Sequence, residues 1–246
     1  MPKTYIETFD EGPGGWIADL WSPLPVWDGV AYCVSPWSVD ANHAPPGAGY
    51  LHLLMYLLTH ESRQSPEIAE RWGVNRFTEG GFSRDLTNAE LSVRLRGAMD
   101  LSGPLCNYHR PVPSPDIGGA QLLLLVQSHV EGPPKTTPNF ILSGQPFEIT
   151  REWSEQTVKL VADPDQWTCI GSRHDMVHQY GYGDIAEVLS DVNVDIIFIL
   201  FPLNIVPIGE VDDIHHQWAN KDYKVDMEYL PKGVVMFDTV KITYPT

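Results

Sequence analysis

Alternation of apolar and polar residues is the clearest pattern in this chain, and it is typical of β-strands. It is strongest over residues 49–59, with the sequence GYLHLLMYLLT. As a strand, this segment presents leucine and methionine on one face, and on the other face it presents Tyr50, His52, Leu54 and Tyr56. One face can therefore build a core, while the other offers phenol hydroxyls and an imidazole for ligand binding or proton transfer.

Two later segments repeat this arrangement. In AELSVRLRG the leucines and the valine lie opposite Arg94 and Arg96, and in AQLLLLVQSHV the side chains of Gln127 and His129 fall on one side. If the three strands are neighbours, their polar faces form a single floor. Tyrosine, histidine, arginine and glutamine on rigid strands suit a polyhydroxylated ligand, so this floor is a candidate saccharide site.

Short alternating segments, punctuated by 21 prolines and 20 glycines, continue along the chain and predict an all-β fold. A helical spacing of apolar residues occurs at residues 184–192, after the capping Asp184. Since no linker-like tract divides the chain, we predict a single domain over residues 1–246. Its expected architecture is a two-sheet antiparallel jelly-roll β-sandwich with long loops and one short helix. The expected strands cover residues 5–9, 30–35, 49–58, 89–96, 120–129, 139–143, 156–161, 195–200 and 234–244.

The segments ETFDEGPGGW, FEITREWSEQTVKL and VVMFDTVKITY together resemble the jelly-roll carbohydrate-binding modules, a concanavalin-like β-sandwich family. The resemblance implies that the first and last strands lie side by side and that Trp16 and Trp153 are packing residues. It also implies a structural calcium ion at Glu7, Asp10 and Asp238. Calcium takes six to eight oxygen ligands, which three acids near paired strand ends would supply in part. The alternative is that these acids are solvated strand ends.

The candidate floor has a weaker resemblance to the concave face of jelly-roll polysaccharide lyases. Gln127-Ser128-His129 is similar to their Gln-x-His element, whereas their Tyr-Phe-Lys motif near the C-terminus is missing here. In that family arginine and glutamine hold a uronate carboxylate, histidine takes the α-proton and tyrosine protonates the leaving oxygen. The resemblance implies substrate contacts from Arg94, Arg96 and Gln127, and catalytic roles for His52, His129, Tyr50 and Tyr56. The alternative is that the arginines face solvent and the histidines are ordinary sandwich residues.

Several candidate residues lie in expected loops. His174 and His178 are four residues apart, which is the spacing of two metal ligands on a helix, but Gly181 and Gly183 disfavour a helix there. A transition-metal site with a carboxylate and a set of polar loop contacts are both consistent with this cluster. Further substrate contacts are predicted from the loop residues His43, Trp37, Trp218, Arg173 and His174.

Composition limits the classes of partner and cofactor. Lys and Arg number 16 and Asp and Glu number 32, so a net charge of −16 disfavours nucleic acid and anionic membranes as partners. The three cysteines, Cys33, Cys106 and Cys169, are widely spaced, which predicts reduced thiols and no disulfide framework. Because no phosphate-binding loop or dinucleotide fingerprint occurs, no organic cofactor is expected.

The beginning of the chain enters YIETFDEG without a basic region followed by an apolar run. The chain also has no stretch of ~18 apolar residues, so no membrane-spanning helix is expected. These observations predict a soluble cytoplasmic protein, or a secreted one if a signal peptide was removed.

Three functional hypotheses follow. The first is a glycan lyase or hydrolase that binds a saccharide and processes it by acid–base chemistry on the polar floor. The second is a non-catalytic carbohydrate-binding protein with a structural calcium site. The third is a homo-oligomeric structural protein whose loops pack against copies of itself. The histidine-rich loops favour the enzyme among the three.

Overall fold

The structure is a computed structural model, and it describes residues 4–18, 22–35, 50–60, 73–101, 120–131, 137–169, 183–203, 206–207, 223–224 and 232–246. Strands dominate these residues and form two large antiparallel sheets, called sheet A and sheet B below, together with one small pair of strands. The predicted all-β fold with two antiparallel sheets is therefore confirmed. The jelly-roll order of its strands stays a prediction.

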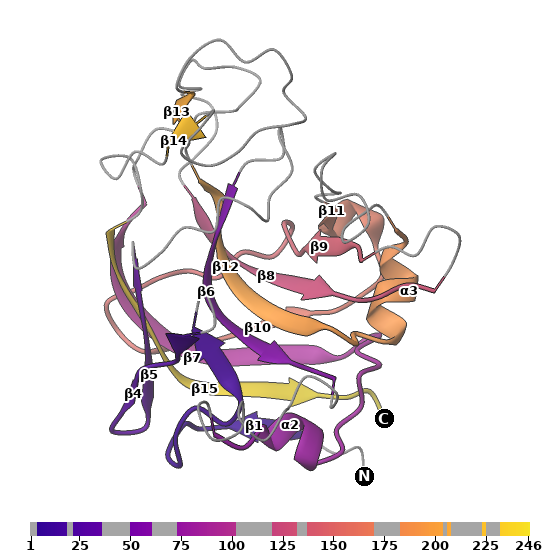
Figure 1. Ribbon diagram of the computed structural model, residues 1–246, viewed down its shortest axis with the longest axis horizontal. Coiled ribbons are helices and arrows are strands. Elements are labelled where there is room, and N and C mark those ends of the chain that lie inside the picture. Colours follow the sequence, from indigo (N-terminus) through magenta and orange to yellow (C-terminus); the bar gives the residue numbers. More distant parts are fainter. Residues whose placement is uncertain are drawn as a thin grey trace.

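Sheet A contains, in spatial order, β10 (Ser154–Lys159), β7 (Glu90–Asp100), β15 (Lys232–Thr243), β5 (Val30–Ser35) and β4 (Val26–Trp27). β1 (Tyr5–Glu7) also pairs with β15, so the first and last strands lie side by side as the family resemblance implied. Figure 1 shows β1, the one-turn helix α2 (Arg76–Glu79) and the C-terminal end of the chain together at one end of the molecule.

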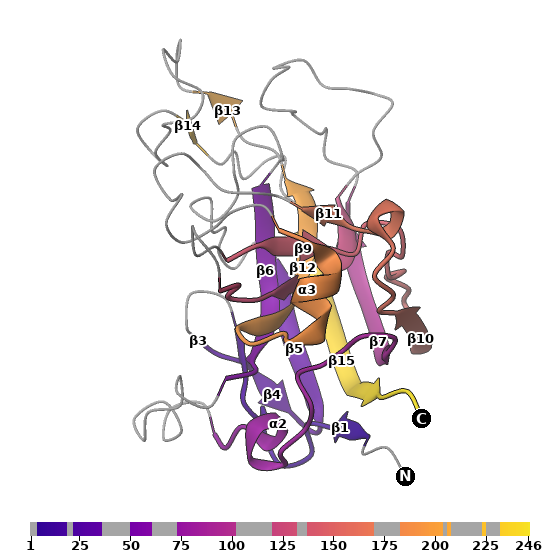
Figure 2. The same ribbon diagram turned by 90° about the vertical axis from the view of Figure 1, so that its right-hand side faces the viewer.

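Sheet B contains, in order, β11 (Thr168–Cys169), β9 (Asn139–Ile141), β8 (Gln121–Gln127), β12 (Asp195–Leu203), β6 (Tyr50–Leu58), β2 (Trp16–Ala18) and β3 (Ser22–Pro23). The small pair consists of β13 (Val206–Pro207) and β14 (Tyr223–Lys224). In the turned view of Figure 2, as in Figure 1, this pair lies at the end of the molecule opposite β1 and α2.

All nine expected strands are present, as β1, β5, β6, β7, β8, β9, β10, β12 and β15. The expected helix is also present as α3 (Ile185–Ser190), where the Asp184 side chain accepts a hydrogen bond from the Ala186 amide. The expectation of one helix is wrong, however, because α2 and the 3₁₀ helix η3 (Pro164–Gln166) occur as well. Each spans four residues or fewer, which is too short for a periodic apolar pattern. Within the described residues, no helix has the length and apolar character needed to cross a membrane.

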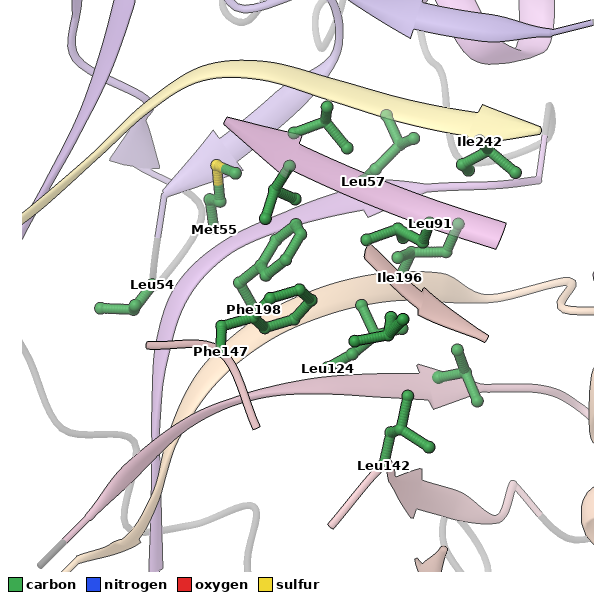
Figure 3. Close-up of a cluster of buried hydrophobic side chains, with 14 of the residues drawn as sticks. Leu54, Met55, Leu57, Leu91, Leu124, Leu142, Phe147, Ile196, Phe198 and Ile242 are labelled. Atoms are coloured by element: carbon green, nitrogen blue, oxygen red, sulfur yellow. The ribbon is translucent and has the colours of Figure 1, made fainter. Parts of the chain in front are cut away.

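The core lies between the two sheets and is rich in aromatic rings. Phe198 of β12 is fully buried, and its ring centroid lies 4.9 Å from that of Phe237 in β15, across the sandwich. The rings of Trp16 and Phe147 each lie 5.7 Å from Phe198. Figure 3 shows the surrounding leucines and isoleucines from both sheets pointing into this layer. Buried Trp16 therefore packs as the resemblance implied.

Candidate functional site

The predicted polar floor does not form, because its three strands do not lie in one sheet. β6 and β8 lie in sheet B on either side of β12, whereas β7, with Arg94 and Arg96, lies in sheet A. The alternating faces of β7 and β8 are as predicted, with leucine and valine side chains in the inner core. The prediction was wrong about which strands are neighbours. The arginines and Gln127 lie on outer faces of the sandwich that point in opposite directions.

A register shift in β6 also changes which of its residues share a face. Met55 and Leu53 lie opposite two successive residues of β12, so Leu54 is an additional residue in a β-bulge. As a result, Leu54 and Met55 both join the inner core, while Leu53 and Tyr56 join a second hydrophobic cluster on the outer face of sheet B. The expectation that Leu54 and Tyr56 share one polar face is therefore wrong.

The backbone of Tyr50 and His52 lies in β6, opposite Leu203 and Leu200 of β12, while their side chains are outside the described residues. Six loop residues predicted from the sequence also lie outside the described residues, namely His43, Trp37, Trp218, Arg173, His174 and His178. Their predicted roles stay predictions.

Gln127 and Tyr56 lie on the outer face of sheet B, among buried side chains. The Gln127 amide donates a 2.6 Å hydrogen bond to Oδ1 of Asn139, and Gln127 lies directly opposite Asp195 of β12. Tyr56, Gln127 and Asp195 are only 5%, 9% and 7% exposed. A ligand would have little of their surface to contact, and Gln127 is already paired with Asn139, so the predicted roles of Tyr56 and Gln127 in a site stay predictions.

His129 follows β8 and is exposed, in contrast to Gln127. Its backbone amide donates to Oδ1 of Asn193, and its Nδ1 lies 2.8 Å from the Thr137 hydroxyl. The Asn193 amide group in turn donates to the His129 carbonyl. These bonds fasten the end of β8 to two neighbouring segments. Neither Arg94 nor Arg96 is on this side of the sandwich, so the arrangement implied by the lyase resemblance is not assembled.

The three acids predicted to bind calcium have separate partners. Glu7 pairs with Arg76, Asp10 accepts a hydrogen bond from the Thr8 hydroxyl, and Asp238 pairs with Arg94. Among the residues that the structure describes, no group of three or more His, Cys, Asp or Glu is placed to hold a metal ion. The calcium ion remains a prediction from the family resemblance, and the geometry adds nothing in its favour.

Arg76 supplies the positive charge that the buried Glu7 carboxylate needs. Its Nε and Nη2 donate hydrogen bonds of 2.9 Å and 2.6 Å to the two carboxylate oxygens, and it also donates to the carbonyls of Glu11 and Gly12. The hydrogen bond to Glu7 raises the pKa of Arg76. Gly14 has a positive φ, and a Cβ there would collide with the same carboxylate. A carboxylate and two carbonyls thus surround a guanidinium rather than a metal ion.

A row of side chains crosses the outer face of sheet A. Tyr32 of β5 lies opposite Met236 of β15, and Met236 lies opposite Arg96 of β7. Trp153 comes directly before β10, whose Ser154 lies opposite Leu95, so Trp153 extends the row beyond Arg96. We call these four residues the Trp153–Tyr32 row. With strands about 4.8 Å apart, it spans about 14 Å.

Two guanidinium groups lie over one indole in this row. The Cζ atoms of Arg94 and Arg96 are 4.9 Å and 4.7 Å from the centroid of Trp153. Arg94 also donates a 2.8 Å hydrogen bond to Asp238, whose carboxylate accepts a second bond from the Thr239 hydroxyl. The cation–π contacts hold the arginine side chains in place on an accessible sheet face. The sequence-based expectation that Trp153 only packs misses this contact.

Apolar side chains extend this face toward its edge. Val34 of β5 and Ile6 of β1 are 42% and 53% exposed. Trp27 of β4 is 75% exposed, and it points away from the core because its neighbour Val26 packs against the core. Asp28 and Gly29, both with positive φ, form the tight turn that holds Trp27 at the end of its strand. These side chains add exposed apolar surface to the outer face of sheet A.

Comparison with known proteins does not assign this surface a role. No family model and no curated protein matches the chain. The candidate site therefore depends on its own geometry.

Proposed function

We propose that this protein is a saccharide-binding β-sandwich and that the ligand lies on the outer face of sheet A, along the Trp153–Tyr32 row. The observation that carries the proposal is the combination of a half-buried indole, a phenol ring and two arginines across adjacent strands. Tyrosine and tryptophan supply an apolar body with a polar end, which suits the C–H faces and hydroxyls of a sugar. The arginines supply hydrogen-bond donors at the side.

Binding without catalysis fits this face better than the acid–base enzyme does. General acid–base chemistry needs a proton-transfer group within hydrogen-bond reach of the bound substrate. Of the candidate proton-transfer residues, Tyr56 and His129 lie on or beside sheet B, on the other side of the core from Arg94 and Arg96. Asp238, an acid beside the row, is paired with Arg94. The proposal therefore takes up the hypothesis of a carbohydrate-binding protein.

Replacing Trp153 with alanine is expected to weaken saccharide binding about 10- to 100-fold, because an aromatic residue on which a ligand packs contributes about 2 kcal/mol or more. The measurement is titration calorimetry with a panel of neutral and acidic oligosaccharides. Trp153→Phe keeps a ring and is expected to bind with intermediate affinity.

Lys159→Ala is the matched control for these variants. Lys159 is an exposed residue of β10 next to β7, and it pairs with Glu90 at 3.7 Å, away from Trp153. The variant Lys159→Ala should bind saccharides like the wild type. If Trp153→Ala unfolds at the wild-type temperature and still binds normally, the ligand is not on this face. If no saccharide binds and Trp27→Ala or Trp153→Ala instead dissociates a dimer in sedimentation, the face is an interface between copies and the proposal fails.

A further inference from the structure

Arg96 differs from the other arginines that the structure describes. Arg76, Arg84 and Arg94 each form an ion pair with a carboxylate, and Arg151 is exposed to solvent. Arg96 is half-buried, and within the described part of the chain it forms no ion pair. Its Nε is buried and donates no hydrogen bond there, so the cation–π contact with Trp153 is the main interaction that stabilises its charge. A half-buried charge in this situation favours a counter-ion from outside the chain.

The composition makes this arrangement informative. Acidic residues outnumber basic residues two to one, 32 to 16, so most arginines would be expected to find a carboxylate. Asp238 bonds to Arg94, and Glu155 of β10 lies directly opposite Arg94. Neither acid forms an ion pair with Arg96. Arg96 is therefore the arginine of this cluster that has no carboxylate partner in the described part of the chain.

We propose that the saccharide recognised by this protein carries an anionic group, a carboxylate or a sulfate, that binds the outer amino groups of Arg96. This inference depends on the proposed saccharide function and deepens it. Because the Nε of Arg96 is buried, the anion meets the Nη1 and Nη2 end, which offers paired donors to a planar carboxylate. Asp238 competes with the ligand, since it occupies Arg94 and adds a negative charge beside the site.

The first test compares oligogalacturonates that have free carboxylates with the same chains as methyl esters. The titrations are made at about 0.15 M salt, because the salt then screens the electrostatic field of the protein's net charge beyond about 8 Å. The wild type is expected to bind the free acids at least about tenfold more tightly, as one hydrogen-bonded charge pair contributes 1.4 kcal/mol or more. A sulfated galactan oligosaccharide serves as a third ligand and distinguishes sulfate from carboxylate.

Two variants separate this inference from the proposed function. Asp238→Asn removes the competing carboxylate and should bind the anionic ligands several-fold more tightly, with no change for the methyl esters. Arg96→Gln should lose the preference for anionic ligands, while Lys159→Ala should keep it. If the wild type binds esters and acids equally and Asp238→Asn changes neither, the inference is wrong but saccharide binding stands. If no oligosaccharide binds, the proposed function and the inference both fail.

Discussion

Replacement of Arg76 by alanine is expected to lower the free energy of unfolding by about 3–5 kcal/mol, because it leaves a buried carboxylate without its counter-charge. Glu7 is 1% exposed, and it accepts hydrogen bonds from two nitrogens of Arg76 and from the Phe9 amide. Arg76 also bonds to two carbonyls of the loop that follows β1. The substitution therefore removes the group that holds the N-terminal strand and its loop against α2.

Urea unfolding of the wild type and of Arg84→Ala provides the comparison. Arg84 pairs with Asp191 at 2.8 Å, but both side chains are more than one third exposed, so its loss should cost about 0–1 kcal/mol. Equal losses for the two variants would contradict the role given to Arg76. The double variant Glu7→Leu/Arg76→Met should recover much of the stability, since it removes both buried charges together.

Thermal unfolding of the wild type and of Arg76→Ala, with and without calcium, tests the calcium prediction. In the structure Arg76 already neutralises Glu7, and Asp10 and Asp238 have partners elsewhere. A rise in the unfolding temperature of the wild type with calcium, reversed by a chelator, would show that the family resemblance holds despite this geometry. If calcium stabilises Arg76→Ala alone, the ion replaces the missing guanidinium at the carboxylate and carbonyl oxygens.

The strands could be predicted from the sequence because alternation is a local property. Leu91, Val93 and Leu95 alternate with polar residues in β7, and all three are buried. The helix α3 could also be predicted from the sequence, because Asp184 caps a short segment with helical spacing. The register shift at Leu54 could not be predicted from the sequence, since the surrounding segment is apolar at almost every position and has no signal for a bulge.

The neighbours of each strand could not be predicted in the same way. Arg94 and Gln127 were placed on one floor because their strands have similar patterns, but the fold puts them in different sheets. Pairing between distant segments depends on the packing of the whole sandwich, and alternation leaves it undetermined. The Trp153–Tyr32 row was missed for this reason, because Tyr32, Arg96, Trp153 and Met236 come from four distant parts of the chain. Its weak sequence signals are a tyrosine within an otherwise apolar strand and a tryptophan directly before another.

Replacement of Phe198 by alanine is also expected to cost about 3–5 kcal/mol of unfolding free energy, through lost burial and the cavity left behind. Phe198 is fully buried in β12, and its ring packs on Phe237 of the opposite sheet as well as on Trp16 and Phe147. The cavity would lie between the sheets, where strands on both sides are held by hydrogen bonds and can collapse only in part. Urea unfolding again provides the measurement.

Phe198→Leu is the matched variant, because it keeps most of the apolar volume and should lose clearly less stability than Phe198→Ala. Val34→Ala, on the exposed outer face of sheet A, should lose little. If Phe198→Ala is no less stable than Val34→Ala, the two sheets do not share the core described for them. Since Phe198 packs in the core between the sheets and not on the outer face of sheet A, Phe198→Leu should retain saccharide binding, whereas Trp153→Phe should lose affinity with little change in stability. Opposite effects of these two variants would separate the residues that hold the sandwich together from those that bind the ligand.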